Sequence, residues 1–348
     1  MLDMQQAAPD RIYLFDNIKA GLIFLVVLGH MLELCLGGLR TYAYTLIYCF
    51  HMPLFIFCSG CFARYQPRRL WERVLYPYVL FQLIYWYLFQ RGQGTGLSFF
   101  TPYWTLWYLL TLFIWTLALP FWEMVKEKRR LVFILLAFAF GLLIGFDSSA
   151  GYFLSVSRAA VFFPFFLLGQ YLRNSRLWDS PLLRPEPGRH KPGGRGRFLW
   201  AIRAVTGFSA LALAFWIYRN QAGINPTWLY CSFGYGYLKY KVSYRLLHYG
   251  AALAFSAAAL AWAPRGRHWF TVIGERCLQI YLLHGLLIKL WAKFELYRYP
   301  ESHLLVWCVA LSAALTLILA AGPITRLARP FLTWPFFAGR KEKKDIGS

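Results

Sequence analysis

The feature that most constrains this chain is a series of ten apolar segments of about 17 to 25 residues, separated by short polar stretches. They cover residues 12–36, 41–63, 71–90, 103–122, 131–147, 153–172, 198–218, 242–262, 271–292 and 303–325. Each can cross a hydrocarbon layer about 30 Å thick, and a crossing segment must be helical because lipid cannot satisfy unpaired backbone groups. With 59% hydrophobic residues among 348, the chain is predicted to be an all-α, polytopic membrane protein with about ten transmembrane helices.

The charge distribution predicts the orientation of these helices. The net charge is +22, and Lys and Arg concentrate in alternate loops, at 64–73, 126–130, 173–203, 265–267 and 326–344. Basic loops stay on the cytoplasmic side, so both termini are predicted to be cytoplasmic. The same loops face anionic lipid headgroups, which explains the charge without a nucleic-acid partner.

One membrane domain accounts for nearly the whole chain. We expect a short cytoplasmic N-terminus at 1–11, a membrane domain at 12–325 and a basic cytoplasmic tail at 326–348. The stretch 173–197 is rich in Pro, Gly and Arg and is predicted to be a flexible cytoplasmic loop. The first apolar segment lacks a small-residue cleavage site, so we expect it to remain in the mature chain.

The first apolar segment carries ionisable residues on one face. His30 lies deep in an otherwise uncharged run, and Lys19 lies eleven residues earlier, which places it within roughly 20° of His30 around a helix. Asp16 lies about 40° from His30, and Glu33 follows one turn later. Ionisable residues at membrane depth are expensive and usually functional, so this stripe indicates a site. The simpler alternative is a structural histidine bonded to a neighbouring helix.

Further ionisable residues lie at or near the predicted membrane spans. The strongest candidates are Arg158, Arg245 and His284, and His51 and His248 are weaker. For each, the alternative is a structural ion pair or a headgroup contact. Glu275 is predicted to point away from His284, by about 180° around the helix.

The sequence does not indicate a metal centre or a permanently bound cofactor. Its seven histidines are scattered without a short-spaced pair, so a zinc or iron site is not expected. Cys58 and Cys61 have C-x-x-C spacing, but they end an apolar helix and lack a second pair of ligands.

Several segments together resemble the acyltransferase 3 family of integral-membrane O-acyltransferases, and most closely its fucose 4-O-acetylase-like branch. They are Arg11–Lys19, Val26–His30, Phe50–Phe55 with Ser59–Gly60, Leu106–Leu110, Phe162–Gly169 and Ile280–His284. They follow the family's order over nearly the whole chain. Two positions depart from the family pattern: Lys19 stands where an arginine is common, and Cys277 stands where a small hydroxyl residue is usual. Lysine keeps the charge but lacks the bidentate fork of arginine.

The resemblance implies transfer of an acyl group, usually acetyl, from cytoplasmic acyl-CoA as co-substrate to a hydroxyl of a sugar on a glycan or glycolipid. His30 is then expected to act as a general base or to form a transient acyl-histidine, and the sequence leaves both open. Glu33, or less plausibly Asp16, would orient the imidazole. Lys19 and Arg11 would hold CoA phosphates, and Arg158, Arg245 or His284 would contact the substrate or its oxyanion. The expected location is the plasma membrane, with lipid as a further partner.

Three other functions are compatible with the composition. A transporter or flippase would use the intramembrane charges as a relay, although no matching halves with broken helices are evident. A second, unrelated group of membrane-bound O-acyltransferases also uses a buried histidine, but the early position of His30 favours the first family. A non-catalytic anchor would have no need of the ionisable residues.

Overall fold

The computed structural model describes residues 11–180, 183, 194–294 and 303–334, and every regular element among them is helical. The longer α-helices are α1 (Tyr13–Leu32), α2 (Gly38–Phe62), α4 (Tyr76–Tyr85), α5 (Trp107–Leu117), α7 (Glu127–Leu143), α8 (Val156–Arg173), α9 (Gly194–Asn220), α10 (Val242–Trp262), α12 (Cys277–Lys293), α13 (Leu304–Leu319) and α14 (Gly322–Leu332). The short ones are α3 (Pro67–Leu70), α6 (Leu119–Met124) and α11 (Thr271–Glu275). The prediction of an all-α fold is confirmed for these residues.

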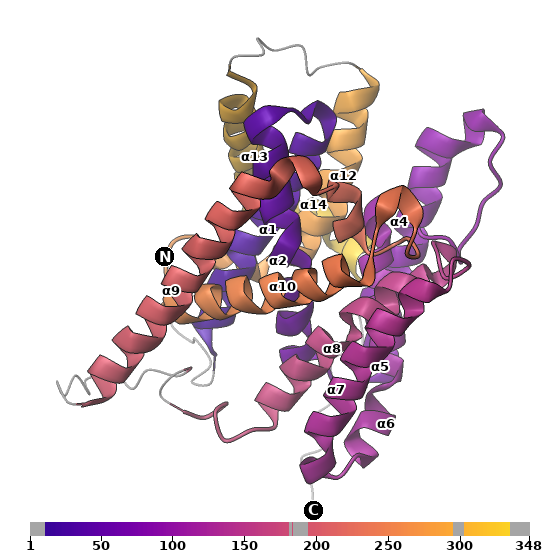
Figure 1. Ribbon diagram of the computed structural model, residues 1–348. Helices are drawn as coiled ribbons and strands as arrows, with labels where there is room; N and C mark the ends of the chain where they lie inside the picture. Colours follow the sequence, from indigo (N-terminus) through magenta and orange to yellow (C-terminus); the bar gives the residue numbers. More distant parts are fainter. Residues whose placement is uncertain (1–10, 181–182, 184–193, 295–302, 335–348) are drawn as a thin grey trace, which may run out of the picture.

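Helices α1 and α2 occupy the centre of the molecule (Figure 1). Helix α2 packs along α8, and each of these two helices contains a proline, Pro53 and Pro164. Glycines allow this close approach: a Cβ on Gly60 would collide with the carbonyl oxygen of Phe166, and one on Gly169 with that of Phe57. Small residues bring helix backbones together where van der Waals packing drives association.

The N-terminal turn of α1 is held by α11 in the same way. A Cβ on Gly274 would collide with the carbonyl oxygen of Asp16. Thr271 of α11 donates a hydrogen bond to the side-chain oxygen of Asn17, at 2.6 Å. The amide of Asn17 in turn donates to two carbonyls of the α10–α11 loop, at 2.8 Å each. These contacts fix the end of α1 that carries Asp16 and Lys19.

Six helical stretches among the described residues are long and apolar enough to cross a membrane. They are Tyr13–Cys35, Gly38–Phe62, Trp104–Met124, Glu127–Phe146, Phe153–Arg173 and Arg197–Gly223. The pair α13 and α14 would be a seventh, but it is bent by 73°. The chain is therefore a multi-pass membrane protein, while the count of about ten stays a prediction.

The remaining predicted spans differ from straight membrane helices. In 71–90, five-residue π-helical segments flank α4, at Trp71–Leu75 and Trp86–Gln90. The span at 271–292 breaks at Arg276, between α11 and α12. The span at 242–262 corresponds to α10, which lies across α1 and α2 in Figure 1. A hydropathy pattern registers apolar length and is insensitive to such breaks and inclinations.

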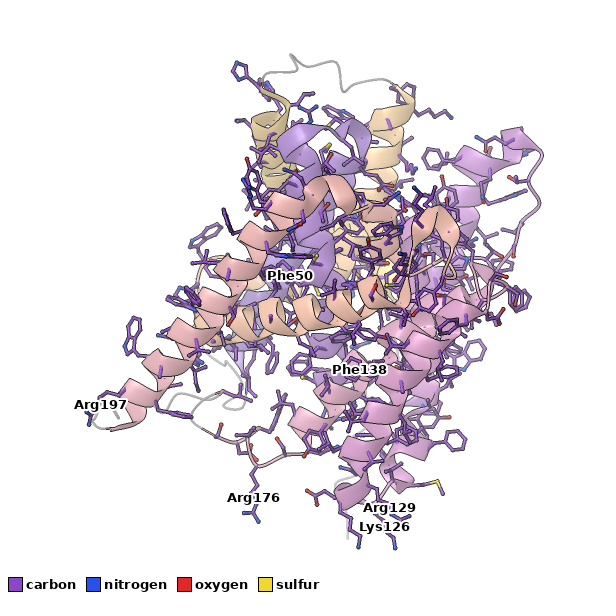
Figure 2. The ribbon with its side chains drawn as sticks, in the orientation of Figure 1. Phe50, Lys126, Arg129, Phe138, Arg176 and Arg197 are labelled. Carbon is purple, nitrogen blue, oxygen red and sulfur yellow. The ribbon has the colours of Figure 1, made fainter. Side chains whose placement is uncertain are left out.

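Several basic residues of the loops lie at one end of the molecule. Figure 2 shows Lys126, Arg129 and Arg176 at the lower end of the view, and Arg197 at the lower end of α9. This grouping is what the positive-inside rule requires of loops that share a compartment. The orientation itself, with both termini cytoplasmic, stays a prediction.

Candidate active site

Two cavities meet inside the helical bundle. The larger, about 770 Å³, opens beside the C-terminal end of α2 and is called here the cationic cavity. Five of its lining residues are basic: Lys19, Arg64, Arg69, Arg73 and Arg173. Among the described residues that line it, none is a carboxylate. A cavity with one sign of charge attracts a polyanionic ligand.

The inner end of the cationic cavity is neutral and polar. Ser59 and Tyr108 share a hydrogen bond of 2.6 Å between their hydroxyl oxygens. Cys58 and Cys277 also line this end, the latter at the position where the family pattern has a hydroxyl residue. Apart from Lys19 on α1, the cations of the lining therefore lie toward the loops, and the side chains between the helices are neutral.

Lys19 reaches the cationic cavity from α1, but its charge is already partly balanced. Its Nζ lies 2.8 Å from one carboxylate oxygen of Asp16, and Arg11 Nε lies 2.8 Å from the other. Arg11 also contacts Glu275, with 3.2 Å between Nη2 and Oε1. Asp16 thus binds Arg11 and Lys19. No described contact joins Asp16 to His30, and Arg11 is not among the residues that line the cavity.

The smaller cavity, about 220 Å³, contains His30 and is called here the His30 cavity. Its polar lining includes Glu33, Tyr48, His51 and Arg158, and its aromatic lining includes Trp104, Trp107, Tyr152 and Tyr230. Predicted site residues from the first helix and from α8 are therefore brought together. Concave sites with a few convergent polar groups among aromatic walls are typical of ligand pockets.

His30 and Glu33 form a hydrogen-bonded pair. The distance from His30 Nδ1 to Glu33 Oε2 is 3.1 Å, and Tyr48 Oη lies 3.4 Å from the same nitrogen. A carboxylate can only accept a hydrogen bond, so Nδ1 carries a proton, and in the neutral form of the ring Nε2 then has the free lone pair. This is the arrangement by which a carboxylate orients a general base.

Trp104 fixes the imidazole from the other side. The ring centroids of Trp104 and His30 are 4.4 Å apart. Trp104 has a φ of 38°, a region that bulky residues rarely occupy, and such strain persists only where the surroundings impose it. Lys289 lies over the same indole, with Nζ 4.4 Å from the ring centroid. The indole therefore restricts both the rotation of His30 and its exposure to solvent.

Arg158 and His284 approach His30 in different ways. Arg158 lines the His30 cavity, donates to the carbonyl of Tyr230 at 3.1 Å, and lies 5.1 Å from the Trp107 centroid. His284 is fully buried behind His30, with ring centroids 5.5 Å apart. Its Nδ1 pairs with the Ile280 carbonyl at 3.0 Å, while Nε2 has no partner among the described residues. It therefore lies beside the His30 ring without lining the His30 cavity.

Arg245 lies elsewhere and has a structural environment. It is fully buried and donates to Tyr240 Oη, Gly141 O and Phe233 O at 3.0 to 3.1 Å. These bonds join α10 to α7 and to the loop before α10. Arg245 does not line the His30 cavity, so the structure does not bring it to the other predicted site residues.

Tyr281 lines both cavities and separates them. Its hydroxyl donates to the carbonyl of Thr105. Its ring lies 5.2 Å from that of Tyr108 on the cationic side and 5.9 Å from that of His284. Tyr281 is therefore the side chain through which the two cavities adjoin.

Sequence reasoning missed the aromatic part of the site. Tyr48, Trp104, Tyr108 and Tyr281 were not predicted as site residues, although Tyr281 shares a helix face with Cys277 and His284. From the sequence, the arginines of the cationic cavity mainly predicted which loops are cytoplasmic. Their convergence on one cavity depends on how α2, α4 and α8 pack, which helix periodicity does not encode.

Comparison with known proteins identifies the family of the chain. No curated protein and no solved structure is significantly similar to the chain. An acyltransferase domain family, however, matches residues 12–336, which is nearly the whole chain. The chain belongs to the acyltransferase 3 family of membrane acyltransferases.

Proposed function

We propose that the protein transfers an acyl group, most simply acetyl, from acyl-CoA in the cationic cavity to a hydroxyl group in the His30 cavity. The observation that carries this proposal is the shared wall at Tyr281: a polyanion site and a histidine–carboxylate pair lie on its two sides. A two-substrate transfer requires this arrangement, because donor and acceptor must meet at one reacting carbon.

Charge supports acyl-CoA as the donor. CoA carries a pyrophosphate and a 3′-phosphate, and Arg64, Arg69 and Arg73 offer bidentate phosphate contacts at the loop end of the cavity. Lys19 lies eleven residues before His30 on α1, which corresponds to about 16 Å along the helix axis. An extended pantetheine arm covers a similar length, so phosphates near Lys19 and the arginines leave the thioester close to His30.

The proposed chemistry is attack of the acceptor oxygen on the thioester carbonyl carbon. His30 Nε2 removes the hydroxyl proton as the C–O bond forms, and Glu33 stabilises the resulting imidazolium through Nδ1. The C–S bond then breaks, and CoA leaves as a thiolate that takes up the proton held by His30, which returns the imidazole to its neutral form. Arg158 is the cation placed to stabilise the developing oxyanion.

The acceptor we favour is a sugar hydroxyl on a glycan or glycolipid. Trp107, Tyr152 and Tyr230 line the His30 cavity and offer flat faces of the kind on which sugar rings stack. With the basic loops in the cytoplasm, His30 would lie toward the opposite face of the plasma membrane. The donor would then enter from the cytoplasm and the acceptor from the other side or from the bilayer.

The direct test is transfer of radiolabelled acetyl from acetyl-CoA by the purified protein in native lipid vesicles. We expect His30→Gln to lower the transfer rate about 10²- to 10⁴-fold while leaving acetyl-CoA binding intact. His268→Gln is the matched control, because His268 is exposed and outside both cavities. Wild-type turnover in a folded His30→Gln protein would overturn the proposal.

A further inference from the structure

A third cavity lies between α9, α10 and α2 and is called here the α9–α10 cavity. It measures about 270 Å³, and its walls are almost entirely apolar. Leu213, Ile217, Leu247 and Ala251 are characteristic of its lining. Its composition suits a hydrocarbon chain and is unsuited to a nucleotide or a free sugar.

The bilayer supplies such chains at this position. Helix α9 is apolar enough to cross the membrane, and none of its central window is buried. Its side chains Phe208, Leu211 and Phe215 are 66 to 74% exposed, as lipid-facing residues are. Trp216 and Leu247 both line the cavity and are exposed. The cavity therefore opens toward the acyl region of the membrane. Figure 1 shows α9 on the outside of the helical bundle.

Two buried polar atoms of the lining would stay without a hydrogen-bond partner if a bare hydrocarbon filled the cavity. His248 and Trp228 line it and are only 4% and 7% exposed. Among the described residues, neither His248 Nε2 nor Trp228 Nε1 has a hydrogen-bond partner. An unpaired buried polar atom costs about 1–3 kcal/mol. A lipid with ether, ester or glycosidic oxygens where its chain meets its headgroup would offer both atoms a hydrogen-bond partner on this side of Leu229.

The short 3₁₀ helix Pro226–Tyr230 joins this cavity to the His30 cavity. Leu229 lines both, Trp228 lines the α9–α10 cavity, and Tyr230 lines the His30 cavity. Tyr230 is held in place by Arg158 at its carbonyl and by Tyr44 at its hydroxyl, the latter at 2.6 Å. A single amphiphile could therefore place its chain on one side of Leu229 and its hydroxyl headgroup on the other.

We propose that the acyl acceptor is a membrane lipid whose hydrocarbon chain binds in the α9–α10 cavity while its hydroxylated headgroup enters the His30 cavity. This inference rests on the proposed function and narrows its acceptor to lipid-linked hydroxyl compounds. A water-soluble glycan would make no use of the apolar cavity or of the two unpaired polar atoms in its lining.

Chain binding can be measured without turnover. The probe is a dodecyl glycoside with a diazirine in its alkyl chain, photolysed with the full protein in nanodiscs, and its attachment sites are mapped by mass spectrometry. We expect labelling on α9 and α10, reduced about tenfold by Ala251→Trp or Leu213→Trp, which fill the cavity. Ala257→Trp is the matched control, since Ala257 lies on α10 but is exposed outside the cavity.

The acceptor class is tested separately. Membranes containing the protein are incubated with radiolabelled acetyl-CoA, and base-labile label is partitioned between chloroform–methanol and water. We expect the label in the lipid phase, with about tenfold less in Ala251→Trp. Label confined to water-soluble product, or photolabelling unaffected by both filling variants, would overturn the inference. Absence of transfer to either phase would contradict the proposed function instead, and the photolabelling would still decide whether the cavity binds chains.

Discussion

The contact between Glu33 and His30 gives the most informative perturbation of the proposed mechanism. Glu33→Gln keeps the size of the side chain and removes its charge, so the 3.1 Å contact to Nδ1 loses its charge assistance. A charge-assisted hydrogen bond contributes about 1.5–3 kcal/mol. Glu33 is 33% exposed, so solvent screening favours the lower part of that range, about 1.5–2 kcal/mol. Because 1.36 kcal/mol corresponds to a factor of ten, kcat should fall about 10- to 30-fold.

The assay is acetyl transfer by Glu33→Gln, His30→Gln and the double variant. If Glu33 acts only through the imidazole, the double variant should be no slower than His30→Gln alone, because residues that act as a unit are non-additive. KM for acetyl-CoA should stay unchanged in Glu33→Gln, since Glu33 does not line the cationic cavity. The exposed Glu123→Gln serves as the matched control. If kcat of the double variant were about 10- to 30-fold below that of His30→Gln, Glu33 would not act through the imidazole.

Three further predictions test the donor site and the packing. Replacing Arg69 and Arg73 by Gln should raise KM for acetyl-CoA about tenfold, and more strongly at low salt, whereas Arg129→Gln outside the cavity should leave KM unchanged. An equal rise in KM in both variants would contradict a specific phosphate site. Gly169→Ala should destabilise the protein by about 1–3 kcal/mol in thermal melts, because the added Cβ would collide with α2. Gly250→Ala is the control with free space around its Cβ, and unchanged melting temperatures of both variants would contradict the α2–α8 packing. Copper–phenanthroline oxidation should cross-link Cys35 to Cys308, because their sulfurs lie 3.5 Å apart. After denaturation, alkylation should then modify five of the seven cysteines, and modification of all seven would contradict the α1–α13 contact.

Within a single helix, the sequence was sufficient to predict neighbours. The 3.6-residue period correctly placed Asp16 beside Lys19 and His30 beside Glu33, because both pairs lie on one helix and its 3₁₀ extension. The same reasoning could not say that Arg11 would contact both Asp16 and Glu275. The second contact depends on α11, whose Gly274 packs against the carbonyl of Asp16.

Between helices, residue type was a poor guide to position. Arg158 and Arg245 are both arginines near the start of apolar segments, yet only Arg158 lines the His30 cavity. The carbonyls that surround Arg245 come from α7 and from an irregular loop, and no periodic pattern encodes them. The wall formed by Tyr281 likewise requires α12, α5 and α1 to be assembled before it can be recognised.

The central claim is that a CoA thioester reaches His30 through the cationic cavity. The most direct measurement is a structure with a non-hydrolysable acetyl-CoA analogue in which the thioester sulfur is replaced by a methylene group. In that structure we expect phosphate density against Arg64, Arg69 and Arg73, a displaced Tyr281 side chain, and the acetyl carbonyl in contact with His30. An analogue bound away from this cavity, or one whose acetyl group lies on the far side of an unmoved Tyr281 ring, would contradict it.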